Sequence, residues 1–270
     1  MTYINKLGVY KMKKIAILIY GVFAYLMFFA VFLYAVGFIG NIYITQSLDA
    51  IPNIPFTQAL MINLGLLALF ALQHSGMART GFKNWITQYI PRSAERSTYV
   101  FISNLAMIMI FYFWQPMGGF LWSFENEAIK NIILVLYMFG WGVLFYSSFL
   151  IDHFHLFGLK QVWYQLKNKT INTSHFMIPS FYKRVRHPLY VGWAIIVWAT
   201  PVMSAAHFVF ALGCTVYILA GIKLEEKDLE KEFGDEYRNY KKQVPMIIPA
   251  LKAKDLGTDQ FISKLKEESQ

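Results

Sequence analysis

Long apolar segments constrain what this chain can fold into. Residues 15–39 contain no Asp, Glu, Lys or Arg, and further apolar segments run over 56–72, 98–114 and 129–151. Each is long enough to cross a hydrocarbon core as a helix, which takes about 17 to 25 residues. Hydrophobic residues make up 56% of the chain, against roughly 45–50% in soluble domains. We therefore predict an all-α, polytopic transmembrane helical bundle, with about four spans in residues 1–151 and a helix hairpin after them.

The basic residues are concentrated in alternate connections between these segments. A formal net charge of +9 would by itself be compatible with nucleic-acid binding. However, the connections at 41–56, 117–128 and 201–206 contain no Lys or Arg, whereas those between them are basic. Lys and Arg accumulate in cytoplasmic loops of membrane proteins. The pattern predicts that both termini are cytoplasmic, that the lipid bilayer is a partner and that nucleic acid is not.

The chain after residue 151 divides into three parts. An aromatic-rich connection, expected on the cytoplasmic side, covers 152–187, a helix hairpin and binding segment covers 188–249, and a polar tail covers 250–270. The hairpin arms, 189–203 and 206–223, turn around Pro201. Antiparallel helical arms of similar length, each rising roughly 22–27 Å, return Glu225 and Glu226 to the level of His187 and Tyr190.

The two ends of this hairpin carry complementary chemistry. Pro188 suits the first turn of a helix because it has no amide hydrogen to leave unpaired. The free amides and the dipole of that turn favour an anion, to which Arg186 and His187 add donors. Tyr190 offers a flat face, and Gly192 permits a close backbone approach. Glu225 and Glu226 are adjacent on a helix, so only one of them can point squarely inward.

A carboxylate facing an anion-binding turn suits a zwitterion with a separate cationic centre. S-adenosylmethionine fits that description, with its carboxylate at the helix start and its amine or sulfonium near a glutamate. The alternative is structural, because Arg, His and Tyr are common anchors at a membrane surface. We expect no metal site.

The joint pattern resembles the signature of the membrane methyltransferases. That superfamily includes isoprenylcysteine carboxyl methyltransferases and phospholipid N-methyltransferases, which use S-adenosylmethionine without a Rossmann domain. The resemblance implies cofactor binding by the residues that match the signature: Arg186, His187, Pro188, Tyr190, Gly192, Glu225 and Glu226. Segments at 73–79, 95–100 and 152–159 resemble one branch, the methanethiol S-methyltransferases, which convert methanethiol to dimethyl sulfide.

A thiol acceptor has to be ionised, because the thiolate is the nucleophile and a cysteine thiol has a pKa of about 8.5. Imidazole titrates nearest neutrality, which makes His74 and His153 candidates for promoting ionisation, with Asp152 or Arg184 nearby. For each histidine, a hydrogen-bonded structural role at a helix end is the alternative. His207 is expected on the far side of the membrane as an ordinary residue.

Two rival functions remain open at this stage. The acceptor could instead be a prenylated cysteine carboxylate or a phospholipid amine, which need a wide lateral opening to the bilayer. The chain could also be a small transporter or scaffold rather than an enzyme. Transporters commonly show internal repeats and charged residues within their spans. No repeat is visible here, and the four predicted spans lack Asp, Glu, Lys and Arg apart from Lys130 at the start of one of them. The favoured reading is a multi-pass protein of a bacterial inner membrane whose cofactor site faces the cytoplasm. The sequence leaves the oligomeric state open.

Overall fold

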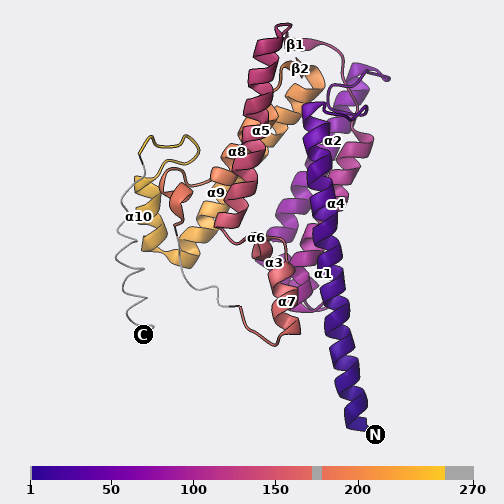
Figure 1. Ribbon diagram of the computed structural model, residues 1–270, viewed down its shortest axis with the longest axis vertical. Helices are drawn as coiled ribbons and strands as arrows, with labels where there is room; N and C mark the ends of the chain where they lie inside the picture. Colours follow the sequence, from indigo (N-terminus) through magenta and orange to yellow (C-terminus); the bar gives the residue numbers. More distant parts are fainter. Residues whose placement is uncertain (1, 172–177, 253–270) are drawn as a thin grey trace.

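Five long helices run roughly along the longest axis of the molecule (Figure 1). The computed structural model describes residues 2–171 and 178–252, with side chains from Tyr10 onward. Within these residues, five helices are long and apolar enough to cross a membrane. They are α1 (Thr2–Gly40), α2 (Phe56–Ala78), α4 (Arg92–Phe113), α5 (Glu127–Leu150) and α9 (Ala205–Phe233). The all-α, polytopic prediction is confirmed, with α9 as a fifth helix of spanning length. The cytoplasmic orientation of the termini stays a prediction.

The helices begin at residues that suit a helix start. The Asn126 side chain accepts hydrogen bonds from the amides of Ala128 and Ile129 at the start of α5, and Ser204 caps α9 in the same way. Helix α4 follows Pro91 and begins at Arg92, so the predicted span at 98–114 started too late. Hydropathy marks only the part of a helix that lies in lipid, where charged residues are costly. A charged residue can still be part of the same helix beyond that apolar part. Arg96 therefore lies inside α4.

One end of the bundle is closed by a small sheet that the sequence did not predict. Strand β1 (Phe120–Ser123) pairs antiparallel with β2 (Val202–Ser204). The loop between α1 and α2 reaches the same end, where Asp49 accepts a hydrogen bond from Nδ1 of the buried His207 at 3.0 Å. This contact gives His207 a structural role, as expected.

The opposite end holds the short helices. They are α3 (Thr80–Ile86), α6 (His153–Leu156), α7 (Leu159–Leu166), the 3₁₀ turn η1 (Ser180–Lys183) and α10 (Asp235–Gln243). Within the aromatic-rich connection at 152–187, the described residues form the short helices α6 and α7 and the turn η1. Residues 172–177 of this connection lie outside the described residues. Of the polar tail, only 250–252 is described.

The hairpin arms are unequal, so the prediction of matched helical arms was wrong. Helix α8 (Pro188–Trp198) has 11 residues and α9 has 29. A residue that precedes proline is disfavoured in the helical region, and α8 ends just before Thr200 and Pro201, which lead into β2. The extended segment compensates for the missing turns. It adds roughly 20 Å at about 3.3 Å per residue to about 16 Å of helix, which matches the roughly 33 Å that α9 rises to Glu226.

Helix α8 packs closely against α5 through two glycines. A Cβ on Gly192 would lie 2.7 Å from the amide nitrogen of Leu144 and 2.9 Å from the carbonyl oxygen of Gly140. Small residues allow such close approach between membrane helices. Gly192 therefore faces α5, and the close backbone approach that was expected at this glycine is an approach to that helix. The contact fixes α8, and with it the residues at its start.

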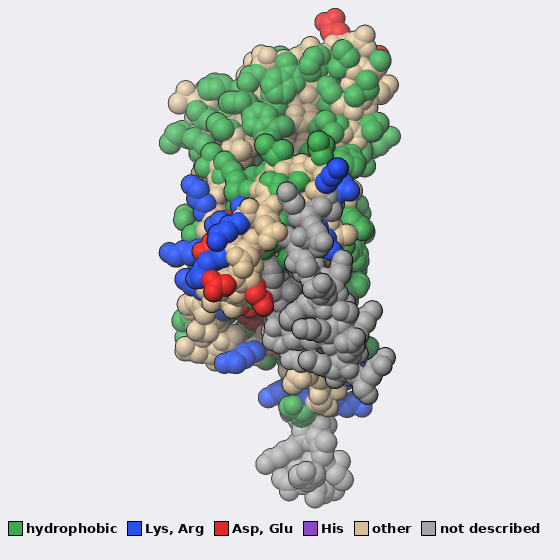
Figure 2. All heavy atoms as spheres, turned by 90° about the vertical axis from the view of Figure 1, so that its left-hand side faces the viewer, with side chains coloured by type: hydrophobic (Ala, Val, Ile, Leu, Met, Phe, Trp, Pro, Cys, Tyr) green, Lys and Arg blue, Asp and Glu red, His purple; other side chains and the backbone are tan. Residues whose placement is uncertain are grey.

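On the outer surface of the bundle, hydrophobic and charged side chains occupy different parts of the long axis. Seen from the left-hand side of Figure 1, the upper part of the surface is mostly hydrophobic apart from acidic atoms at its very tip, and Lys, Arg, Asp and Glu side chains gather below it (Figure 2). Membrane lipid can cover an apolar belt but not a charged surface. The charged lower part of this face carries the short helix α10 and the end of α9.

Candidate active site

The start of α8 and the polar end of α9 lie in direct contact. Arg186 and His187 both bond to Glu226, and Tyr190 bonds to Glu225. These are the residues that the sequence predicted would meet. The contact forms although the arms differ in helical length, because the extended segment restores the overall distance.

Glu226 is the centre of a buried ion-pair cluster. Its carboxylate accepts from Arg186 Nε at 2.8 Å, from His187 Nε2 at 3.1 Å and from Lys241 Nζ at 2.8 Å. Its side chain is only 7% exposed. Hydrogen bonds to Glu226 and Glu230 raise the pKa of Lys241, which keeps that partner charged. Glu226 is thus fully engaged by the protein and joins α8, α9 and α10.

Glu225 is in the opposite situation. Its side chain is 45% exposed and accepts one hydrogen bond, from the Tyr190 hydroxyl at 2.9 Å. Among the described residues, the one basic side chain within 4 Å of its carboxylate is that of His187, whose Nδ1 is 3.9 Å away. The expectation that only one glutamate points inward therefore has a specific form: Glu226 is used by the fold, and Glu225 remains half-exposed with a single hydrogen bond.

The segment after α10 holds the turn before α8. Arg186 donates from Nη1 to the carbonyl oxygens of Lys241 and Val244, at 2.9 and 2.6 Å. The Arg186 amide donates to Pro245, and the His187 amide to Met246. Pro188 is buried at the first position of α8. The first intrahelical bond runs from Val191 to His187, so the helix start retains free amides, as helix geometry requires.

His74 lies in a polar cluster that reaches toward Tyr190. Its Nε2 is 2.7 Å from the Tyr99 hydroxyl, and its Nδ1 is 3.2 Å from Ser103 Oγ. The hydroxyls of Tyr99 and Tyr217 are near enough to that of Tyr190 to interact with it electrostatically. Of the four residues suggested for thiol ionisation, His74 is thus the one linked to the Glu225 side of the site.

His153 belongs to a separate, apolar environment. It is buried, with Nε2 at 2.9 Å from the Tyr25 hydroxyl and Nδ1 at 2.7 Å from Ser148 Oγ. Its ring stacks on Phe149 with centroids 4.2 Å apart. Burial lowers the pKa of His153 against the opposing charge of Asp152. With both nitrogens paired and its ring stacked, His153 packs α6 against α1 and α5.

The side chain of Asp152 and the backbone of Arg184 make contacts that do not involve His74 or the ring of His153. Asp152 caps α6 by accepting from the His155 amide at 3.1 Å and forms an ion pair with Lys160. Burial alone would raise the pKa of Asp152, but these hydrogen bonds and the Lys160 charge hold it below its usual value. Arg184 has an exposed side chain, and its carbonyl accepts from the Ala250 amide. Neither side chain bonds to either histidine ring within the described residues.

Sequence reasoning missed several residues of this end of the bundle. Lys241 completes the Glu226 cluster, while Arg96, Tyr99 and Tyr217 surround His74. Arg96 and Tyr99 fell in the segment at 95–100 that resembled known enzymes, but no role was assigned to either. One signal was available in the sequence: Arg96 is a basic residue just before the predicted apolar span at 98–114.

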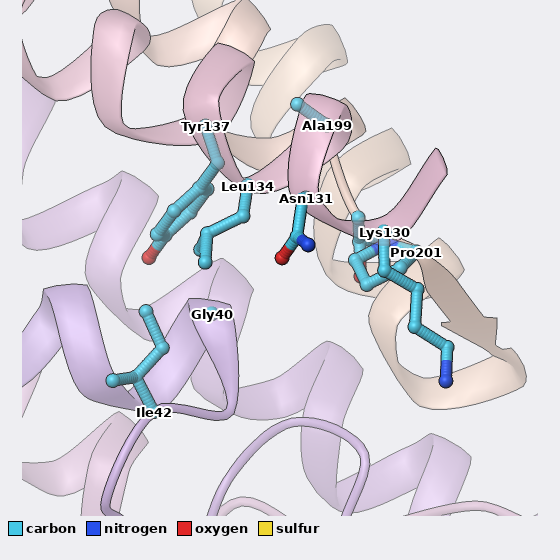
Figure 3. Close-up of a pocket in the computed structure, with 9 residues that line it drawn as sticks. Gly40, Ile42, Lys130, Asn131, Leu134, Tyr137, Ala199 and Pro201 are labelled. Atoms are coloured by element: carbon cyan, nitrogen blue, oxygen red, sulfur yellow. The ribbon is translucent and has the colours of Figure 1, made fainter. Parts of the chain in front are cut away.

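A cavity of about 180 Å³ lies at the other end of the bundle. Its lining includes Lys130, Asn131, Leu134 and Tyr137 on α5, with Pro201 before β2, and Figure 3 shows Lys130 extending away from Tyr137. No histidine or carboxylate lines it. It therefore does not share the chemistry of the Glu225 site.

Fold and site together define a helical integral membrane protein with a cluster of polar and charged side chains at one end of its bundle. The chain is 49% identical to methanethiol S-methyltransferase of Crocosphaera subtropica over 88% of this chain and 93% of that protein. It is 44% identical to methanethiol S-methyltransferase 1 of Bradyrhizobium diazoefficiens over 87% of this chain and 83% of that protein. Nurim of Xenopus laevis is 30% identical over 73% of this chain and 74% of its own length. No family model and no solved structure matches the chain.

The chain belongs to the methanethiol S-methyltransferase family. It is accordingly an enzyme of the methyltransferase class, and the alternative of a transporter or scaffold is set aside.

Proposed function

We propose that this enzyme transfers a methyl group from S-adenosylmethionine to methanethiol, which gives dimethyl sulfide. The observation that carries the proposal is the division between the two glutamates. A half-exposed carboxylate, Glu225, stands beside a buried and fully paired one, Glu226. The names of the most similar relatives support the thiol acceptor over a prenylated cysteine or a phospholipid amine.

The residues of the site fit a zwitterionic methyl donor. When bound, S-adenosylmethionine supplies an electrophilic methyl group on a sulfonium. Glu225 can take its cationic groups, because no Lys or Arg among the described residues pairs with that carboxylate. The free amides at the start of α8 can take its carboxylate. Arg186, His187 and Glu226 hold this helix start in position, and Gly192 fixes it against α5.

The thiol lies, on this proposal, between Tyr190 and the His74 cluster. The Tyr99 hydroxyl already bonds to His74 Nε2, so Tyr99 can receive the thiol proton as it hands its own to His74. His153, Asp152 and Arg184 contribute by packing, capping and backbone contacts. We further propose that the protein lies in a bacterial inner membrane and that the site faces the cytoplasm. The reason is that connections rich in Lys and Arg alternate with connections that lack them.

Changing His74 to asparagine should lower kcat for methanethiol about 100-fold, in the range expected for loss of a general base. His153→Asn is the matched comparison and should lower thermal stability while each folded molecule retains most of its turnover. Initial rates of both purified variants across a range of pH would measure this. Wild-type turnover and an unchanged pH profile in His74→Asn would rule out His74 as the proton acceptor.

The decisive experiment supplies purified protein, in detergent or nanodiscs, with S-adenosylmethionine and methanethiol, and measures dimethyl sulfide in the headspace. We expect dimethyl sulfide and S-adenosylhomocysteine in equal amounts. Parallel reactions contain a prenylcysteine analogue or phosphatidylethanolamine instead of the thiol. Methylation of either of these with no dimethyl sulfide would overturn the proposed acceptor. A titration that detects no S-adenosylmethionine binding would overturn the proposed donor.

A further inference from the structure

Arg96 is a cation within α4 that has no carboxylate partner in the part of the chain that the structure describes. Its Nε donates to the carbonyl oxygen of Leu156 at 2.6 Å, and its guanidinium carbon lies 4.8 Å from the centroid of the Tyr99 ring. No acceptor bonds to its Nη1 or Nη2 among the described residues. Neighbouring Glu95 contributes charge at a distance but forms no ion pair with it. Most of the hydrogen-bonding capacity of this guanidinium is therefore unused.

Other arginines of the described chain show how unusual this is. The partly buried Arg186 and Arg79 are paired with Glu226 and Asp228, and the exposed Arg238 is paired with Asp235. Arg92 and Arg184 lack a carboxylate partner but are exposed to solvent. A partly buried and uncompensated charge in a membrane helix is costly, and such residues mark functional sites.

The surroundings of Arg96 connect it to the reaction site. It is close enough to His74 to interact electrostatically, and Tyr99 lies between its guanidinium and that imidazole. Tyr99 in turn lies near Tyr190, which bonds to Glu225. In the same cluster, Gln73 Oε1 is buried without a hydrogen-bond partner among the described residues. The unused donors of Arg96 and the free acceptor of Gln73, joined through Ser103, His74 and Tyr99, thus give this cluster hydrogen-bonding capacity for a small polar ligand.

We propose that Arg96 binds the methyl acceptor as its thiolate. This inference rests on the proposed function and names the group that compensates the charge of the nucleophile. The S–H bond breaks, and the proton passes through Tyr99 to His74 and then to water. The thiolate sulfur forms a bond to the methyl carbon while the bond from that carbon to the sulfonium breaks, and its electron pair stays on the donor sulfur. Arg96 returns to its unpaired state when the neutral thioether leaves.

This role carries a selectivity. A fixed positive charge stabilises an anionic nucleophile in a medium of low dielectric constant and repels a protonated amine. Arg96 thus favours thiols over amine headgroups, whatever the width of the opening to the bilayer. The role also predicts that kcat/KM depends less on Arg96 for a more acidic thiol, because such a thiol ionises more readily by itself.

The test compares Arg96→Gln with wild type on two thiols, ethanethiol and the more acidic 2,2,2-trifluoroethanethiol, alongside methanethiol. We expect kcat/KM to fall about 100-fold for the two alkanethiols, with an alkaline shift of the pH profile, and to fall far less for the acidic thiol. Arg96→Lys keeps the charge and should keep the pH profile. Arg92→Gln, one turn earlier on the exposed start of α4, should match wild type. S-adenosylmethionine affinity, measured by calorimetry, should be unchanged in all variants.

Equal losses of Arg96→Gln on acidic and ordinary thiols, or wild-type rates, would overturn this role while leaving the proposed function intact. Should Arg96→Gln fail to fold, Arg96→Lys decides, and an alkaline shift in that variant would contradict the proposal. A wild-type enzyme that binds S-adenosylmethionine but methylates no thiol would instead overturn the proposed function, and this role with it.

Discussion

Changing Glu226 to glutamine should lower the free energy of unfolding by about 3 kcal/mol, the scale for removing one partner of a buried ion pair. The substitution leaves Arg186 partly buried without a compensating carboxylate, replaces the carboxylate that accepts from His187 by a neutral amide, and removes one of the two acids that bind Lys241. Because α8, α9 and α10 all meet at this carboxylate, the loss should appear as a lower unfolding temperature of the detergent-solubilised protein.

Glu225→Gln provides the control for that stability effect. Its side chain is 45% exposed, so its loss should change the free energy of unfolding by less than about 1 kcal/mol, as for surface charges. Thermal unfolding followed by circular dichroism compares the two variants directly. Equal destabilisation by both substitutions, or none by Glu226→Gln, would contradict the different roles that we assign to the adjacent glutamates.

The same Glu225→Gln substitution should weaken S-adenosylmethionine binding by about 10- to 100-fold. A hydrogen bond to a charged group contributes about 1.5–3 kcal/mol, and every 1.4 kcal/mol corresponds to roughly a tenfold change in affinity. The physical reason is that a neutral amide hydrogen-bonds to an ammonium group but does not neutralise it. Isothermal titration of the purified variant measures the effect without depending on turnover.

Asp228→Asn is the matched control for the binding experiment. Asp228 lies on the same helix and is also exposed, but it pairs with Arg79 and Lys231. Its removal should leave the affinity for S-adenosylmethionine unchanged. If both acids prove equally important, the general negative charge of this end of α9 matters rather than a specific contact with Glu225. Wild-type affinity in Glu225→Gln would refute the assignment outright.

The membrane class and the meeting of the two polar clusters were predictable because both depend on local rules. A segment without charges that is long enough to cross lipid has few alternatives to a helix. A chain that turns back at Pro201 must return to its starting level, so Glu225 and Glu226 had to approach Arg186 and Tyr190. This held although the first arm is partly extended.

The form of that first arm was not predictable from its own residues. Residues 202–204 are apolar or small and continue an apolar segment, yet they pair with 120–123 as strand β2. The partner strand lies far away in the sequence, and no local pattern shows that the two will meet. Apolar periodicity alone does not separate a short buried strand from the end of a helix.

By itself, the sequence determined that this is a helical membrane protein with cationic and anionic groups meeting at the start of α8, since hydrophobic length and chain reversal are properties of contiguous residues. Only the tertiary structure decided which glutamate serves the fold and which remains half-exposed, because Lys241 reaches Glu226 from a different helix. It also decided that His74 lies beside Tyr99 and Arg96, whereas His153 packs against Phe149. The residue types were alike in both comparisons, and their roles differ because burial and partners are set by elements distant in the chain.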